Sequence, residues 1–115
     1  MNKYKARKTV VDGIEFDSKK EANRYQELRL LEREGEIRNL RRQIKIPLLP
    51  AQKDRPDANE RAVDYICDFI YTDEKTNRII IEDVKGYRGG AAYATFVIKR
   101  KLLKWRYPQY IFKEI

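Results

Sequence analysis

Two adjoining segments in the middle of the chain, Val63–Tyr71 and Arg78–Lys85, are rich in apolar residues. Side chains alternate between the two faces of a strand, so each segment presents apolar residues to both faces. Strands of this kind are buried on both sides, which predicts a central place in a sheet. In the first segment, one face carries Val63, Tyr65, Cys67, Phe69 and Tyr71, and the other carries Asp64, Ile66, Asp68 and Ile70. In the second segment, one face carries Ile79, Ile81, Asp83 and Lys85, and the other carries Ile80, Glu82 and Val84.

The polar stretch between the two segments predicts a turn centred on Lys75 and Thr76, and therefore an antiparallel hairpin. Two carboxylates that face each other across a ladder destabilise it by roughly 0.2–1 kcal/mol, so we expect a cation between them. Hard oxygen ligands favour Mg²⁺ or Mn²⁺. The predicted register pairs Tyr71 with Ile80, Ile70 with Ile81, Phe69 with Glu82, and Asp68 with Asp83.

Lys85 follows Asp83 by two positions and returns to the same face of the strand. A lysine beside metal-binding carboxylates can hold a nucleophilic water or stabilise a phosphate oxyanion. The pattern therefore indicates metal-assisted phosphodiester hydrolysis. The alternative is a register slip or a bulge, which would leave Asp68 exposed on an edge and Lys85 merely closing the strand.

The N-terminal part of the chain predicts a hairpin followed by a helix. Asp12-Gly13 lies in the middle of Thr9–Phe16 and is a strong hairpin signal. Ser18-Lys19-Lys20-Glu21 matches a capping box, which opens a helix that ends near Glu34. Glu21 lies on the helix face that also carries apolar residues, so it can serve as a capping residue or point toward the carboxylate site.

The segment 38–49 alternates basic and apolar residues and predicts another strand, with Gln43 as a candidate second-shell amide at the site. The polar, proline-containing segment 47–61 predicts a loop. Ala91–Tyr107 predicts a basic helix whose apolar stripe consists of Ala94, Ile98, Leu102 and Trp105. Residues 109–115 predict a final strand.

Composition narrows the class of protein. With 115 residues the chain suits one domain, and a net charge of +8 favours a polyanionic partner, for which nucleic acid is the simplest choice. Without a histidine and with one cysteine, Cys67, the chain excludes histidine zinc sites, Ser-His-Asp triads and an internal disulfide. Cys67 is expected in the core. Neither a membrane span nor a signal peptide is expected, which indicates a cytoplasmic protein.

The basic residues gather in the N-terminal segment 1–8, in the strand-like segment 38–45 and in the basic helix. Because phosphate contacts supply most of the electrostatic affinity for DNA, these segments are expected to bind the DNA backbone. The solvated face of an ordinary helix is the alternative explanation for the lysines of the basic helix. The candidate DNA contacts are Arg42, Arg88, Lys99, Arg100 and Lys104.

The order of these elements resembles the PD-(D/E)xK nuclease superfamily, which includes restriction endonucleases and archaeal Holliday junction resolvases. A helix with Glu21, a strand with Asp68, a strand with Asp83-Val84-Lys85 and a basic helix follow one another. The motifs Lys-Thr-Val-Val-Asp-Gly-Ile-Glu-Phe-Asp-Ser-Lys-Lys-Glu-Ala, Tyr-Ile-Cys-Asp-Phe and Val-Lys-Gly further resemble a family of small phage-encoded nuclease-like proteins. The resemblance covers nearly the whole chain.

This resemblance implies a single restriction-endonuclease-like domain over 1–115, with a mixed central sheet flanked by helices and a small N-terminal hairpin. It implies that Asp68 and Asp83 bind Mg²⁺ or Mn²⁺ with help from Glu21, that Lys85 positions the attacking water, and that Lys99 lies near the scissile phosphate. The implied activity is that of a DNA endonuclease in the cytoplasm of a phage host. Branched DNA is its candidate substrate, and a homodimer is its candidate assembly.

One departure from the superfamily pattern concerns the first aspartate. No proline precedes Asp68, and the literal Pro56-Asp57 pair lies in a polar loop away from any strand signal. Asp68 is the better candidate because a strand surrounds it. Two other functions stay open: a DNA-binding module that keeps the fold without cleaving, and an enzyme that acts on RNA through its 2′-hydroxyls.

Overall fold

The N-terminal elements form as the capping and turn signals predict. The computed structural model describes residues 8–115, so most of the basic N-terminal segment lies outside the described residues. Strands β1 (Thr9–Val11) and β2 (Ile14–Phe16) form an antiparallel hairpin. Helix α1 (Lys19–Arg33) begins at Ser18, whose hydroxyl accepts the N–H of Glu21 at 3.0 Å. Gly35 ends it with a positive φ of 77°, which glycine adopts without strain.

The main sheet of residues 8–115 has four strands in the order β3-β4-β5-β6. β3 (Ile37–Leu49) and β4 (Val63–Asp73) pair antiparallel, as do β4 and β5 (Ile79–Asp83). Helix α2 (Gly90–Arg106) then crosses over, so that β6 (Ile111–Glu114) pairs with β5 in parallel. The fold is mixed α/β, as the alternation of strand and helix patterns predicts.

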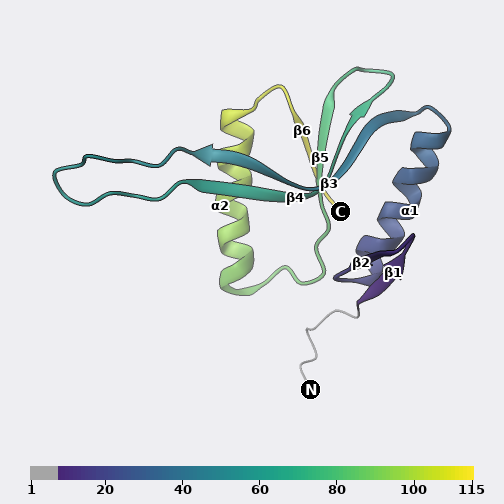
Figure 1. Ribbon diagram of the computed structural model, residues 1–115, viewed down its shortest axis with the longest axis horizontal. Helices are drawn as coiled ribbons and strands as arrows, with labels where there is room; N and C mark the ends of the chain where they lie inside the picture. The colour runs from purple at the N-terminus through teal and green to yellow at the C-terminus, as the bar shows by residue number, and fades with distance from the viewer. Residues whose placement is uncertain (1–7) are drawn as a thin grey trace.

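The two helices cover opposite faces of this sheet. Ile80 packs in a cluster with Tyr25 and Leu28 of α1, whereas its neighbour Ile81 packs with Phe96 of α2. Consecutive residues of a strand point to opposite faces, so the hairpin and α1 form one layer and α2 the other (Figure 1). This arrangement explains why β4 and β5 are apolar on both faces.

The predicted faces of β5 are confirmed, but those of β4 are wrong in one respect. Tyr65 and Cys67 pack in the α2 cluster, whereas Phe69 and Tyr71 pack in the α1 cluster. The strand thus changes faces at Asp68. Opposite it on β3, Gln43 has a positive φ of 51° and forms no ladder pair, although Arg42↔Phe69 and Ile44↔Cys67 on either side do. This paired irregularity redirects both strands.

The predicted apolar stripe of α2 is present, but most of it faces solvent and not the sheet. Phe96 and Leu103 are the buried residues of this helix, whereas Ala94, Ile98 and Trp105 point to solvent. Leu102 of the predicted stripe is half-buried and contacts the core. The helix has apolar residues on two sides, so its sequence pattern alone did not determine which side faces the sheet.

Between β3 and β4 the chain projects away from the body of the molecule (Figure 1), and every residue from 50 to 62 is exposed. The predicted loop is therefore present, although β3 continues to Leu49 and an isolated bridge joins Gln52 and Glu60. Among residues 8–115, no helix has the length and apolar character needed to cross a membrane.

Candidate active site

The register of β4 and β5 brings the predicted acidic residues to the same end of the strand pair. Three of the predicted ladder pairs, Phe69↔Glu82, Ile70↔Ile81 and Tyr71↔Ile80, are confirmed. The fourth, Asp68 with Asp83, is wrong because the ladder ends at Phe69↔Glu82. Asp68 instead accepts the backbone N–H of Val84 on its Oδ2 at 2.7 Å, so its carboxylate closes the end of the strand pair.

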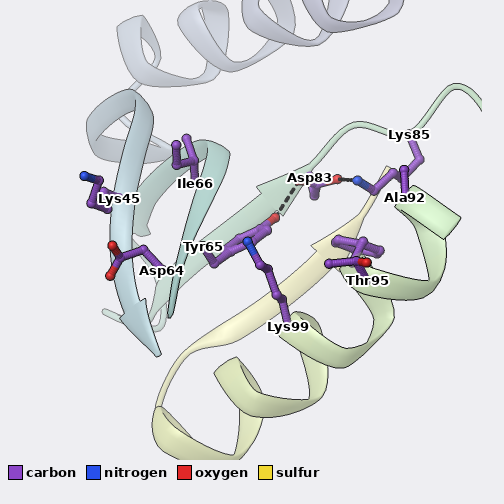
Figure 2. A pocket seen from close by; sticks show the side chains of 10 residues that line it. Lys45, Asp64, Tyr65, Ile66, Asp83, Lys85, Ala92, Thr95 and Lys99 are labelled. Atoms are coloured by element: carbon purple, nitrogen blue, oxygen red, sulfur yellow. Dashed lines mark hydrogen bonds and ion pairs between the residues drawn. The ribbon is translucent and has the colours of Figure 1, made fainter. Parts of the chain in front are cut away.

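Asp83 is held by one neighbour on each carboxylate oxygen. Tyr65 donates its hydroxyl to Oδ1 at 2.5 Å, and Nζ of Lys85 lies 2.6 Å from Oδ2 (Figure 2). The carboxylate is buried, and burial raises its pKa, although Lys85 and Tyr65 act in the opposite direction. Its Oδ2 accepts no well-directed hydrogen bond, so the ion pair with Lys85 is its one polar contact among the described residues.

Glu21 and Asp68 form a second acidic group around the amide of Gln43. Nε2 of Gln43 donates to Oε1 of Glu21 at 3.2 Å and to Oδ1 of Asp68 at 3.1 Å. Glu21 is buried, and burial together with the charge of Asp68 raises its pKa from 4.5 to about 7. The amide of Gln43 therefore lies between two of the predicted carboxylates and is hydrogen-bonded to both.

The two acidic groups open into two hollows that adjoin the segment 83–87. Asp83 and Lys85 line one hollow of about 490 Å³, between the start of β4 and α2. Glu21 and Asp68 line the other, of about 460 Å³, beside the start of α1. The groups are electrostatically coupled, since the charge of Asp68 contributes to raising the pKa of Asp83. The structure thus brings all four predicted catalytic residues into one region.

The donor chemistry of this region suits a hard divalent cation. Carboxylate oxygens are the ligands that Mg²⁺ prefers, and the buried Oδ2 of Asp83 has a cation beside it already. The assembly is incomplete, however, because nowhere in residues 8–115 do three or more acidic or cysteine side chains converge as a metal-binding group. The cation that lies beside Oδ2 of Asp83 in this structure is the ammonium group of Lys85.

The hollow beside Asp83 is lined by three lysines. Lys45 belongs to β3, Lys85 follows the end of β5, and Lys99 belongs to α2 (Figure 2). Nζ of Lys85 also lies 3.8 Å from the ring centre of Phe96, a cation–π contact that fixes its position. The predicted Lys99 is thus on the same hollow as Asp83 and Lys85, and Lys45 joins it.

Three of the predicted DNA contacts have partners within the protein. Nε of Arg88 donates to Glu114 at 2.7 Å, and Arg100 lies 3.5 Å from the same carboxylate. The guanidinium of Arg42 stacks 4.4 Å above the ring of Phe16. These arginines tie loops and layers together. Within residues 8–115, Lys99 and Lys104 of the predicted set form no hydrogen bond or ion pair with a side chain, and Lys104 is exposed at the surface of α2.

Two sets of residues beside the site escape sequence reasoning. Tyr65 looks like an ordinary core residue, and no pattern links it to Asp83. Glu82 is completely buried on the α1 side, where Arg24 binds it through two hydrogen bonds of 2.7 and 2.6 Å and Tyr71 donates its hydroxyl to it. A buried acidic residue requires a cationic partner. The partner of Glu82 is Arg24, which lies 58 positions earlier in the sequence, so no local pattern links the two residues.

Fold and site together define a mixed α/β protein with carboxylates and a lysine grouped at the end of its central strands, beside a basic helix. Residues 1–114 match the family described as "Protein of unknown function (DUF1064)", and the chain belongs to this family. No curated protein matches the chain, and no solved structure does.

Proposed function

We propose that this protein is a Mg²⁺-dependent endodeoxyribonuclease that hydrolyses phosphodiester bonds, with branched DNA such as a Holliday junction as the candidate substrate in phage recombination or replication. One observation carries the proposal: a buried Asp83 with Lys85 at 2.6 Å lies within electrostatic reach of Asp68. A buried carboxylate with a raised pKa beside a lysine and other carboxylates is typical of a catalytic site.

The order of elements supports the finer part of the proposal, a restriction-endonuclease-like fold. Glu21 lies on α1, Asp68 on β4, and Asp83 at the end of β5, with the basic helix α2 following. This is the order in which the PD-(D/E)xK resemblance arranges its acidic residues and its lysine. Fold likeness by itself does not establish activity, so the argument depends on the side chains of the site.

In the proposed mechanism, Asp68 and Asp83 would hold the cation, with Glu21 assisting through Gln43. A bound Mg²⁺ polarises the phosphate and lowers the pKa of the attacking water. Lys85, whose Nζ lies 2.6 Å from Oδ2 of Asp83, would orient the attacking water with its ammonium group. Lys99 would contact the phosphate from the α2 side, since both lysines line the hollow beside Asp83.

The second candidate is a DNA-binding module that keeps this fold without cleaving. It is favoured by the fact that Lys85 already neutralises Asp83 and that both oxygens of Asp68 accept hydrogen bonds. Such a site is satisfied without a metal. An enzyme acting on RNA is a third candidate, and it would require 2′-hydroxyls in the substrate.

One experiment separates these candidates. Wild type, Asp83→Ala and the loop variant Asp57→Ala are incubated with labelled linear, single-stranded and four-way-junction DNA, and with the matching RNA, in Mg²⁺, Mn²⁺ and EDTA. We expect metal-dependent cleavage of DNA by wild type and by Asp57→Ala, because Asp57 lies in the exposed loop paired with Arg55. Asp83→Ala should bind DNA and lose cleavage by at least about a hundredfold.

DNA binding that is equal in Mg²⁺ and in EDTA, without cleavage of any substrate, would leave the binding module as the better account. Circular dichroism and thermal unfolding of Asp83→Ala are measured alongside, so that a loss of cleavage is not confused with a loss of the fold.

A further inference from the structure

Helix α2 exposes a continuous apolar face to solvent. Ile98 has 62% of its surface exposed, and Trp105, the one tryptophan of the chain, has 76%. Ala91 and Ala94 are exposed as well, and Leu102 is half-buried. We call Ala91, Ala94, Ile98, Leu102 and Trp105 the outer face of α2. At 100° per residue these positions fall within a narrow stripe along the helix.

The outer face lies opposite the side of α2 that packs on the sheet. Phe96 and Leu103 fill the inner side and are nearly inaccessible. A helix with a packed inner side usually has polar residues on the other side, and a contiguous exposed apolar patch marks an interaction site. Tryptophan in particular is enriched where interfaces bury their central residues.

We propose that a second copy of this chain docks on the outer face of α2, with the two helices antiparallel about a two-fold axis at Ile98. In this register Ala91 of one copy lies opposite Trp105 of the other, and Ala94 lies opposite Leu102. The two ends of the stripe differ in size, so that each large side chain meets a small one. A two-fold interface requires this kind of self-complementarity.

Charge supports the antiparallel direction. The half of α2 from Gly90 to Ile98 carries no charged residue, whereas the half from Lys99 to Arg106 carries five basic residues and no acidic one. Antiparallel packing places each basic half beside an uncharged half. The two Lys101 side chains are then offset by about 9 Å along the axis, at 1.5 Å per residue. A parallel pair would place them level, where they would repel.

The antiparallel direction has a consequence for the hollows beside Asp83. Thr95 and Lys99 line that hollow from one flank of the outer face. A two-fold axis perpendicular to an antiparallel helix pair leaves these flanks on the same side of the dimer, whereas a parallel pair would turn them to opposite sides. Both candidate active sites would therefore open toward one DNA molecule, and this consequence rests on the proposed function.

The size of the outer face sets the expected strength of the dimer. One tryptophan, one isoleucine and smaller residues on each copy bury roughly 400 Å² per chain, since an aromatic residue alone contributes about 150–250 Å². The total, about 800 Å², is below the roughly 1,200 Å² at which stable interfaces begin. We therefore expect a weak dimer that forms at high protein concentration.

The test measures association without DNA. Sedimentation equilibrium of wild type over a range of concentrations is compared with Trp105→Lys and with Leu30→Lys, a control at an apolar position on α1 that is 53% exposed. We expect the mass of wild type and of Leu30→Lys to approach two chains, and that of Trp105→Lys to stay at one. Wild type that stays at one chain up to its highest soluble concentration would overturn the proposal.

Cross-linking then tests the direction of packing. Ile98→Cys, Ala91→Cys and the control Leu30→Cys are treated with a short bismaleimide, while the native Cys67 is fully buried. Antiparallel helices predict that Ile98→Cys gives cross-linked dimer in severalfold higher yield than the other two, because two Ala91 positions would lie about 21 Å apart along the axis. Equal yields from Ile98→Cys and Ala91→Cys would rule out this register.

The dimer and the proposed function can fail separately. Asp83→Ala should keep the mass of wild type at every concentration, since no residue of the outer face lines the hollow beside Asp83. A protein that stays monomeric but binds vesicles of anionic lipid or an acidic peptide through Trp105 has a different occupant on α2, and that result overturns the dimer while leaving the nuclease assay unaffected.

Discussion

Burial raises the pKa values of two carboxylates at this site, Glu21 and Asp83. Glu21 is the clearest case, because burial and the neighbouring Asp68 raise its pKa to about 7. A group whose pKa is higher in the folded state stabilises the fold below its unfolded pKa, and this contribution is lost as pH rises through the folded pKa. The ordinary value is 4.5, so the relevant window runs from about pH 4.5 to above pH 7.

We expect Glu21→Gln to remove this pH dependence. In the absence of metal, the free energy of unfolding of wild type should fall between about pH 5 and pH 8 relative to the variant, by about 1–3 kcal/mol. Urea unfolding across this range measures it, with the exposed Glu60→Gln as the control. A constant difference between wild type and Glu21→Gln at every pH would show that Glu21 does not titrate in this window.

A polar contact that the hydrophobic pattern does not predict joins α1, β4 and β5 around the buried Glu82. Arg24 on α1 binds Glu82 on β5, and Tyr71 on β4 donates to the same carboxylate. Glu82 comes directly before Asp83, and Arg24 lies one turn after Glu21. The contact therefore fixes α1 on β5 next to Glu21 and Asp83, which belong to the two acidic groups of the site.

Removing one partner of this contact should be costly. Arg24→Met leaves Glu82 buried without a cation, and we expect the free energy of unfolding to fall by about 3–5 kcal/mol. The variant Arg24→Met, Glu82→Leu, Tyr71→Phe has no buried charge and should recover most of that loss. Denaturant unfolding of both variants provides the measurement, and an equal loss in both would show that packing, and not the unpaired charge, sets the cost.

The elements also show how far sequence reasoning reaches. The hairpin, α1 and the pairing of β4 with β5 follow from local signals such as Asp12-Gly13 and the Ser18 cap, so they were predictable. The face change at Asp68 was not, because it depends on a positive φ at Gln43 on the neighbouring strand. The inner side of α2 was not either, since a helix that is apolar on both sides fits two orientations.

For the candidate site, the strand period correctly joined Asp83 with Lys85 and separated Glu82 from them. What the pattern missed are contacts between distant parts of the chain. The hydroxyl of Tyr65 and the pairing of Arg88 with Glu114 arise from tertiary packing, which leaves no periodic signal in a single sequence.

At the scale of the whole molecule, the net charge is +8, but the basic residues differ in how free they are to contact a polyanion. Arg88 and Arg100 share the carboxylate of Glu114, and this ion pairing holds the pKa of Glu114 below its usual range. Within residues 8–115, Lys99 and Lys104 form no ion pair with an acidic residue. Electrostatic attraction to DNA should therefore come from the lysines of α2 more than from the arginines around it.

This difference predicts the salt dependence of DNA binding. Each lost phosphate contact lowers the slope of log K against log salt by about 1, so Lys99→Ala, Lys104→Ala should lower it by about 2. Arg88→Ala, Arg100→Ala removes the same formal charge and should change the slope less. Fluorescence anisotropy over a series of salt concentrations compares the two, and a larger effect of the arginine pair would contradict this assignment.

Cys67 lies at the centre of the sheet with none of its surface exposed, and it is the one cysteine of the chain. Burial raises the pKa of its thiol to about 11, so the native protein presents almost no thiolate to a reagent. Cys67 packs in the cluster between the sheet and α2, so a thiol probe can modify it only when this cluster opens. The rate at which Cys67 is modified therefore measures how often the core opens, both in the wild-type protein and in each variant.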